Sequence, residues 1–340
     1  MKRLLATTAV VAMTIPAMSG MALAEGPYTI GVSNTVQGNG WREQMICAMR
    51  AQAAAEADVE GLIVAHRNTD AAGQLEDLNN LIEAGVDAIV LNPANPDALN
   101  SALDAAIAAG IVVVAVDAGV TAEGAYILSN NQEEYAYLGA RWLFEQIGGE
   151  GEVVYMRGIA GVSADTDRDN GFQRALAEFP GVSVVHEVFT GWQQDQGKQQ
   201  MFDFLATGIP FDGVWTSGID NVIVDAFLES GAPLVPIVGA DNAGFVQYLA
   251  EVEGLSGAAV TNPGSVGGAG IALAVDILNG NAPAETTVLV DPVLWENATA
   301  EGQETIAGAL NPDLDPEWPV SVSIPGWTDY SMAEIIACEG

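Results

Sequence analysis

Short runs of apolar, largely β-branched residues alternate along this chain with longer stretches whose apolar residues recur at helical spacing. The predicted strands are Tyr28–Ser33, Leu62–His66, Ala88–Asn92, Ile111–Asp117, Val153–Arg157, Val182–Phe189, Gly213–Thr216, Val235–Gly239 and Ala258–Thr261. The predicted helices are Trp41–Ala57, Ala71–Ala84, Pro96–Ala109, Glu133–Ile147, Asp167–Phe179, Gln194–Ala206, Val222–Ser230 and Val266–Leu278. Because the strands are apolar on both sides, they predict parallel sheets covered by helices on both faces.

The number of predicted strands favours two sheets over one. All of them in a single doubly wound sheet would be unusual, and a second series of alternating elements begins near residue 131. A chain of 340 residues is long enough for two buried cores. The sequence therefore predicts an α/β protein of two doubly wound lobes.

Residues 1–24 have the features of a secretory signal peptide. A basic start precedes an apolar stretch, and Ala22-Leu23-Ala24 supplies the small-x-small cleavage pattern. A transmembrane anchor is the weaker interpretation, because Pro16 interrupts an apolar run shorter than the ~20 residues that a span needs. We expect an exported chain that begins at Glu25, after cleavage behind Ala24.

Export changes the interpretation of the two cysteines. Cys47 and Cys338 are the only cysteines of the chain, and an even count in an oxidising compartment predicts one disulfide. Two free buried thiols are the alternative. If the bond forms, the tail of about residues 295–340 folds back to the first lobe.

Composition and missing motifs exclude several classes of function. Acidic residues number 45 and basic ones 10, so a net charge of −35 makes a nucleic-acid partner unfavourable. Two histidines and two cysteines leave little room for zinc or iron–sulfur sites, and no dinucleotide or P-loop motif follows a strand. The acidic segment Asp165–Gly171 departs from a calcium loop, whose bidentate Glu would fall on Leu176. We predict neither a metal nor a cofactor.

Polar and aromatic residues gather just beyond the predicted strands, which is the edge where open α/β sheets bind ligands. The candidates for ligand binding are Asn39, Trp41, Arg42, Asn92 and Asp117 in the first half, and Arg168, Trp192, Asp220, Asp241 and Thr261 in the second. Carboxylates, amides and Arg suit vicinal hydroxyls, and Trp stacks on the C–H face of a sugar ring. Ordinary turn chemistry is the alternative for any single polar residue, but turns do not require Trp41, Trp192 or Arg168.

A set of these segments, taken in order, resembles a known family. The segments are Ile30-Gly31-Val32-Ser33, Asn39-Gly40-Trp41, Gly85–Pro93, Ala115-Val116-Asp117, Gly158–Ala164 leading to Arg168, Gly171-Phe172 and Val238-Gly239-Ala240-Asp241. Together they are similar to the periplasmic sugar-binding proteins of ABC importers, the ribose-binding-protein-like group of type I periplasmic binding proteins, over about residues 28–290.

The resemblance implies two Rossmann-like lobes joined by a three-crossover hinge, with the ligand cleft between them. The N-terminal lobe would hold residues 25–130 and about 262–290. The C-terminal lobe would hold residues 131–261 and part of 291–340, with about 295–340 an extension that returns toward the N-terminal lobe.

The resemblance also implies a function and assigns contacts to it. The chain would be a periplasmic, monomeric protein that closes around a monosaccharide and delivers it to an ABC permease in the inner membrane. The family's contacts fall on Asn39, Trp41, Arg42 and Asp117 in one lobe, and on Arg168, Trp192, Asp241 and Thr261 in the other. Departures from the family pattern at Arg42, Ala118, Gly218-Ile219 and Thr261 leave the sugar undefined.

Other functions remain open at this point. A polyol or another small polar metabolite would use the same edge residues, and a chemotaxis receptor would bind in the same way. An exported glycoside hydrolase would use Asp117 and Asp241 as its carboxylate pair. A transcriptional repressor of this fold class is excluded by the signal peptide.

Overall fold

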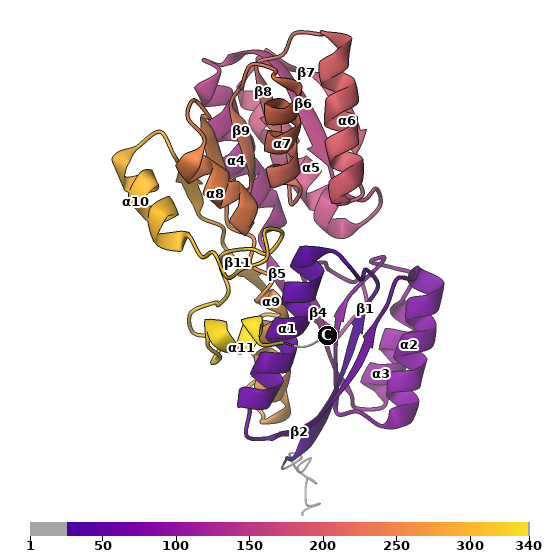
Figure 1. Cartoon of the computed structure of the whole chain (residues 1–340). Helices are drawn as coiled ribbons and strands as arrows, with labels where there is room; N and C mark the ends of the chain where they lie inside the picture. The colour runs from indigo at the N-terminus through magenta and orange to yellow at the C-terminus, as the bar shows by residue number, and fades with distance from the viewer. Residues whose placement is uncertain (1–25, 339–340) are drawn as a thin grey trace, which may run out of the picture.

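The computed structural model describes residues 26–338, which form two α/β lobes, one above the other in Figure 1. Each lobe is built on a six-stranded sheet. The predicted signal peptide, residues 1–24, lies outside the described residues. Within residues 26–338, no helix is long and apolar enough to cross a membrane.

The N-terminal lobe contains a sheet of order β11-β5-β4-β3-β1-β2 in which all neighbouring strands are parallel. Its strands are β1 Tyr28–Asn34, β2 Val59–His66, β3 Ala88–Asn92, β4 Val112–Val116, β5 Tyr126–Asn130 and β11 Thr287–Val290. Its helices are α1 Gly40–Ala55, α2 Ala71–Ala84, α3 Asn100–Ala108 and α9 Val266–Leu278. Helices α1 and α9 pack on one face of the sheet, and α2 and α3 pack on the other.

The C-terminal lobe contains a sheet of order β12-β10-β9-β8-β6-β7, in which only the edge strand β12 is antiparallel. Its strands are β6 Glu150–Arg157, β7 Gly181–Phe189, β8 Gly213–Trp215, β9 Ile237–Ala240, β10 Gly257–Val260 and β12 Leu294–Glu296. Its helices are α4 Gln132–Gln146, α5 Ser163–Glu178, α6 Gln194–Thr207, α7 Asp220–Ser230, α8 Ala243–Glu251 and α10 Ala300–Ala309. A last helix, α11 Met332–Ile336, packs on α1 of the other lobe.

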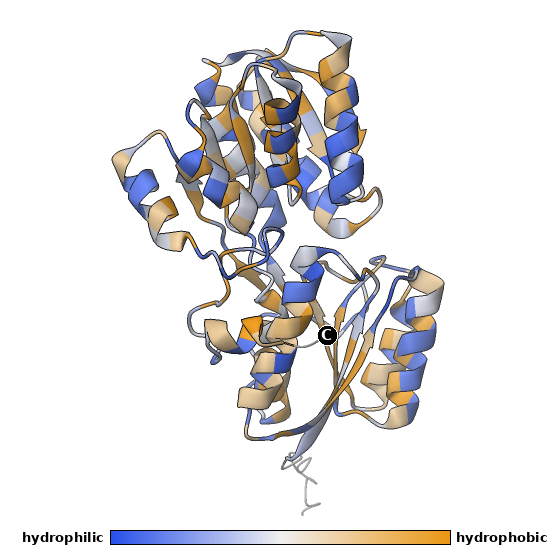
Figure 2. Ribbon diagram, viewed as in Figure 1, coloured by the Kyte–Doolittle hydropathy of each residue, from blue (hydrophilic) through white to orange (hydrophobic). Residues whose placement is uncertain are grey.

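Two local features explain the elements of both lobes: the strands are apolar and buried, and several helices have capped N-termini. Every residue of β3 is buried, as expected for an inner parallel strand with helices on both sides. In Figure 2 the strands are mainly hydrophobic, while α2 and α6 mix hydrophobic and hydrophilic residues. Side-chain oxygens of Asn39, Asp70, Asn131 and Asn242 cap α1, α2, α4 and α8.

The two-lobed α/β architecture predicted from the sequence is confirmed, and the structure adds elements that the sequence analysis did not identify. Strand β5 was missed because it has only five residues and ends in the polar pair Ser129-Asn130. Helix α8 was missed because it begins directly behind the turn at Asp241-Asn242. The short elements β11, β12, α10 and α11 have no clear apolar period of their own.

Within the part of the chain that the structure describes, four segments pass between the lobes. Three passages lie side by side, from β5 into α4, from β10 into α9, and from β11 into β12. The fourth is the C-terminal tail, residues 311–338, which leaves α10 beside the C-terminal lobe and ends against α1 (Figure 1). The resemblance implied a three-crossover hinge, and the tail adds one further connection to it.

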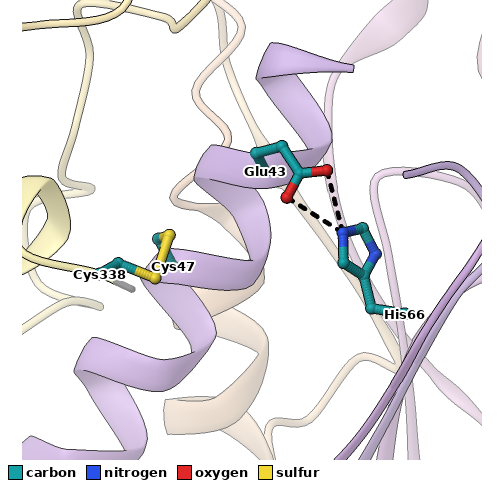
Figure 3. The surroundings of a disulfide bond; sticks show 4 residues. All are labelled: Glu43, Cys47, His66 and Cys338. Carbon is teal, nitrogen blue, oxygen red and sulfur yellow. Dashed lines mark hydrogen bonds and ion pairs between the residues drawn. A yellow bond between two sulfur atoms is a disulfide. The ribbon is translucent and has the colours of Figure 1, made fainter. Parts of the chain in front are cut away.

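A disulfide fixes the end of the tail to α1. It joins Cys47 and Cys338 across 291 positions, with their Cα atoms 5.5 Å apart (Figure 3). The predicted bond is therefore present in the structure. Both cysteines adjoin the same apolar cluster, which also contains Ile335 and Tyr330 of the tail.

We expect the purified protein to contain no free thiol until it is reduced. Intact mass after alkylation should show no label on the unreduced protein and two labels after reduction. Loss of the bond in a Cys47→Ser/Cys338→Ser variant should lower the free energy of unfolding by about 2–5 kcal/mol, because the long loop gains entropy in the unfolded chain. Two labels on the folded, unreduced protein would contradict this assignment.

Candidate functional site

A pocket lies between the lobes, where the carboxyl ends of both sheets meet. About 480 Å³ of space lies between its walls, open solvent at its mouth included. Its lining residues come from both lobes and from the tail: Asn39, Trp41, Arg42, Asp117, Arg168, Trp192, Gly218, Ala240, Asn242, Asn262, Glu317 and Pro319. The structure thus brings six of the ten predicted contacts around one pocket.

Asn39 lies where the two lobes meet. Its Oδ1 accepts a hydrogen bond from the backbone N–H of Arg42 (3.2 Å) and caps α1. Its Nδ2 donates across the gap to the carbonyl of Trp192 (3.0 Å). Two residues further on, the indole Nε1 of Trp41 donates to the carbonyl of Asn262 (2.6 Å), and Trp41 lines the pocket.

Arg42 is held by a chain of hydrogen bonds that begins at the end of β1. Its Nη1 donates to Oδ1 of Asn34 (2.9 Å), and Nδ2 of Asn34 donates to Nδ1 of His66 (2.8 Å). Since Nδ1 accepts, the proton of neutral His66 is on Nε2, which donates to Glu43 at 3.0 Å (Figure 3). His66 is thus a supporting residue behind the pocket.

Burial lowers the pKa of the Arg42 guanidinium, and the positive charge of Arg168 adds to this effect. The carboxylate of Asp117 opposes it. Because an arginine in water titrates far above neutral pH, Arg42 remains charged. Two guanidinium groups and a carboxylate therefore share the pocket.

Gln132 links the charged groups of the two lobes. Its Nε2 donates to Oδ1 of Asp117 (2.8 Å), and its Oε1 accepts from Nε of Arg168 (2.8 Å). The other carboxylate oxygen of Asp117 accepts from Asn92 (3.3 Å). Asp117 adopts a left-handed backbone conformation, with φ 64°, which Asp tolerates better than most residues. Gln132 opens α4 at the first crossover, so the bridge lies at the hinge itself.

Arg168 and Trp192 form the opposite wall. The guanidinium carbon of Arg168 lies 4.5 Å from the ring centroid of Tyr135 and 5.5 Å from that of Trp192. The Trp192 Nε1 donates to Ser217 (3.4 Å), and its backbone is left-handed with φ 52°. A Cβ on Gly158 would lie 2.1 Å from the Trp192 ring, so only glycine leaves room for the indole.

Asp220 does not line the pocket. Its Oδ2 accepts from the backbone N–H of Gly218 (3.0 Å), from that of Ala240 (3.0 Å) and from Nδ2 of Asn242 (2.7 Å). It therefore fixes three neighbours that do line the pocket. Burial raises the pKa of its carboxyl to about 7.

The remaining predicted contacts also lie behind the pocket wall. Asn92 is fully buried beside Asp117. The carboxylate of Asp241 accepts from the backbone N–H of Asn262 (2.8 Å) and of Ser321 (3.3 Å), and burial raises its pKa.

Thr261 connects two crossovers. Its hydroxyl accepts from the backbone N–H of Val293 (2.8 Å), and its own N–H donates to the Val293 carbonyl.

Sequence analysis missed several lining or supporting residues. Asn242 and Asn262 directly follow the predicted contacts Asp241 and Thr261, so their position at the sheet edge was a usable signal. Gln132 follows a strand that was itself missed. Glu317 and Pro319 come from the tail, where no sequence pattern pointed to the pocket.

Comparison with known proteins gives a consistent result. A family model described as "Periplasmic binding protein domain" matches residues 30–282. The chain is 30% identical over 180 residues to a xylitol-binding protein of Mycolicibacterium smegmatis, a match that spans only about half of each chain (51% and 51%). It is 23% identical over 266 residues to a ribose import binding protein of Bacillus subtilis, covering 76% of this chain and 84% of that protein.

A solved structure has the same fold over most of the chain. The crystal structure of an ABC transporter solute binding protein from Thermobispora bispora superposes with a TM-score of 0.76 at 27% identity, covering 86% of this chain and 90% of the other. The family model extends from β1 through α9 and so takes in both lobes and the first two crossovers. The chain therefore belongs to the periplasmic binding proteins, a family of two-lobed binding proteins rather than enzymes.

Proposed function

We propose that this chain is an exported solute-binding protein that captures a monosaccharide between its lobes and delivers it to an ABC-type membrane importer. The observation that carries the proposal is the convergence of six side chains on one interlobe pocket. They are Asn39, Trp41, Arg42, Asp117, Arg168 and Trp192.

The chemistry of these side chains matches a polyhydroxylated ring. Trp41 and Trp192 offer flat apolar faces to the C–H side of a sugar. Arg42 and Arg168 donate to two oxygens each, and Asp117 accepts from hydroxyl groups. The charged groups already have hydrogen-bond partners within the protein. A neutral ligand adds hydrogen-bond donors and acceptors without adding a further charge to the pocket.

Capture by closure follows from the contacts between the lobes. The Asn39–Trp192 hydrogen bond and the Gln132 bridge are formed in this arrangement of the lobes. A ligand that contacts both walls stabilises this arrangement over an open one, because it gains contacts only when the lobes are together. We propose that the permease recognises the closed, loaded form.

A polyol is the second candidate ligand. It offers the same vicinal hydroxyls, and one relative is a xylitol-binding protein. The absence of a ring would reduce the stacking on Trp41 and Trp192, so a polyol would depend more on the Arg and Asp contacts.

The geometry argues against a glycoside hydrolase. Such an enzyme presents two carboxyl groups to the scissile bond. Asp117 lines the pocket, whereas both oxygens of Asp241 accept backbone N–H groups behind its wall. The pair considered from the sequence does not face a common ligand.

We further propose that the chain acts as a monomer in the periplasm after cleavage behind Ala24. The basic start, the apolar stretch and the Ala22-Leu23-Ala24 pattern support export.

A thermal-shift screen tests the proposed function. Purified protein should show a raised melting temperature with at least one pentose, hexose or polyol, because a ligand that binds only the folded state stabilises it by about 2.7 kcal/mol at a hundredfold excess over Kd. Sugars with no effect, together with slow hydrolysis of a glycoside that is lost in Asp117→Asn, would favour the enzyme instead.

Trp192 should contribute through stacking. We expect Trp192→Ala to weaken binding of the sugar found in the screen by at least tenfold, about 1.4 kcal/mol. Trp192→Phe is the matched control and should retain most of the affinity, because it keeps a flat ring. Calorimetric titration measures both. Unchanged affinity in Trp192→Ala would show that the indole only packs.

Arg168 and Asp117 should be required together. Arg168→Ala and Asp117→Asn should each abolish measurable binding. The first leaves Oε1 of Gln132 without its donor. The second replaces one carboxylate oxygen by an NH₂ group that can accept neither from Asn92 nor from a sugar hydroxyl. Each buried group left without a hydrogen bond costs about 1–3 kcal/mol. Asn is chosen at position 117 because it tolerates φ 64°.

The exposed Arg141, which pairs with Glu145 on the surface, provides a matched control. Its change to Ala should leave affinity unaltered. Retained binding in both pocket variants would contradict the assignment.

A further inference from the structure

The C-terminal tail supplies part of the pocket wall, although it lies beyond the segment that the family model matches. We propose that Glu317 of this tail contacts the ligand and determines specificity. Its carboxylate accepts a hydrogen bond from a hydroxyl of a neutral sugar or polyol at the pocket mouth, and it disfavours ligands that carry a carboxylate there. The inference rests on the proposed function and adds to it.

The position of Glu317 at the mouth follows from two neighbouring hollows. Asn39, Trp192 and Glu317 line the ligand pocket, and the same three residues line an outer hollow together with Gln193 and Asp195. Residues shared by both spaces lie at the boundary between them. The mouth is thus formed by one residue from each lobe and one from the tail.

One oxygen of the Glu317 carboxylate is fixed and the other remains available. The Oε2 accepts from the backbone N–H of Gly40 (3.1 Å), the first residue of α1, where a helix favours a negative charge. Among residues 26–338, none donates a hydrogen bond to Oε1. The half-buried carboxylate therefore presents one acceptor, and burial raises its pKa.

The backbone of the tail is held firmly on both sides of Glu317. Pro319 forms a bridge with Asn242, and the carbonyl of Trp318 accepts from the N–H of Ala243 (2.8 Å). On the other side, a Cβ on Gly40 would lie 2.3 Å from the Cβ of Glu317, so the close approach requires glycine. These contacts leave Glu317 little freedom to move from the mouth.

The charges around Glu317 favour hydroxyl groups over anions. Asp315 and Asp195 lie close enough to raise the pKa of Glu317 further. Among the described residues, no arginine, lysine or histidine lies within ion-pair distance of Glu317. A ligand carboxylate at this point would be repelled, whereas a hydroxyl can donate to the free oxygen.

Calorimetric titration of the wild type, Glu317→Gln and Glu317→Ala tests the inference. The probes are D-ribose, D-galactose, xylitol and myo-inositol. Glutamine keeps a carbonyl oxygen that can accept from the Gly40 N–H, but it replaces the free carboxylate oxygen by an amide NH₂, which is a donor. We expect both variants to bind the best of these probes at least tenfold more weakly than the wild type.

Two further variants separate ligand contact from tail structure. Asp313→Asn removes one negative charge from an exposed position on the same tail and should change affinity less than twofold. Gly40→Ala keeps every pocket residue in the sequence but pushes Glu317 away from its position, because the added Cβ would lie 2.3 Å from the Glu317 Cβ. It should therefore weaken binding as Glu317→Ala does. Melting temperatures of the ligand-free variants confirm that each is folded.

Modified probes locate the contact. The analogues are deoxy forms of the probe that binds best, each lacking one hydroxyl. One of them should bind the wild type at least tenfold more weakly than the parent compound, and should bind Glu317→Ala less than twofold more weakly than the parent compound does. The affinity of D-galacturonate relative to D-galactose should rise in Glu317→Gln. If the wild type binds none of these four probes and no other pentose, hexose or polyol of the thermal-shift screen, the proposed function fails and the inference with it. If the wild type binds a probe and both Glu317 variants match it, only the inference is overturned.

Discussion

The hydrogen bonds of Gln132 are the interaction on which the interlobe site depends. Asp117 and Arg168 come from different lobes and are both buried. Moving either charged group alone from water into the protein interior costs on the order of several kcal/mol. One amide accepts from the arginine and donates to the carboxylate, so a single neutral side chain at the hinge gives each charged group a hydrogen-bond partner. The lobes can therefore bring both groups into the cleft with these hydrogen bonds formed.

Much of this arrangement was predictable because it depends on local patterns. Apolar runs and helical periods identified most strands and helices, and the residues behind the strands identified six pocket residues, including Trp41, Arg168 and Trp192. Short elements such as β5 carry too few residues for a pattern to stand out. Asp220, Asp241 and Thr261 were placed at the correct edge of the sheet, yet sequence does not show which way a side chain points there. Their side-chain oxygens accept hydrogen bonds from backbone N–H groups, because a buried backbone N–H also requires a hydrogen-bond partner.

The tail shows a different limit of sequence reasoning. Glu317 reaches the pocket only because the tail crosses the hinge, and no residue near position 317 indicates that path. The two cysteines gave the one usable signal, since a bond between Cys47 and Cys338 requires the chain to return to α1. That bond fixes the end of the tail but leaves the route between α10 and α11 undetermined. The route is set by apolar contacts of Val320, Val322 and Ile324 with both lobes, which depend on the folded surfaces themselves.

The tail also constrains how the lobes can separate. The three short crossovers run together at the hinge, where Thr261 forms hydrogen bonds with Val293 of a neighbouring passage. The tail is attached to the C-terminal lobe at Asn242–Pro319 and to the N-terminal lobe at Cys47–Cys338. Opening must either break the Gly40–Glu317 contact or carry the tail with one lobe and strain the segment between these attachments. The Gly40–Glu317 contact therefore links the mouth of the pocket to the separation of the lobes. Within residues 26–338, the tail is thus a fourth connection between the lobes, and it passes the pocket at its mouth.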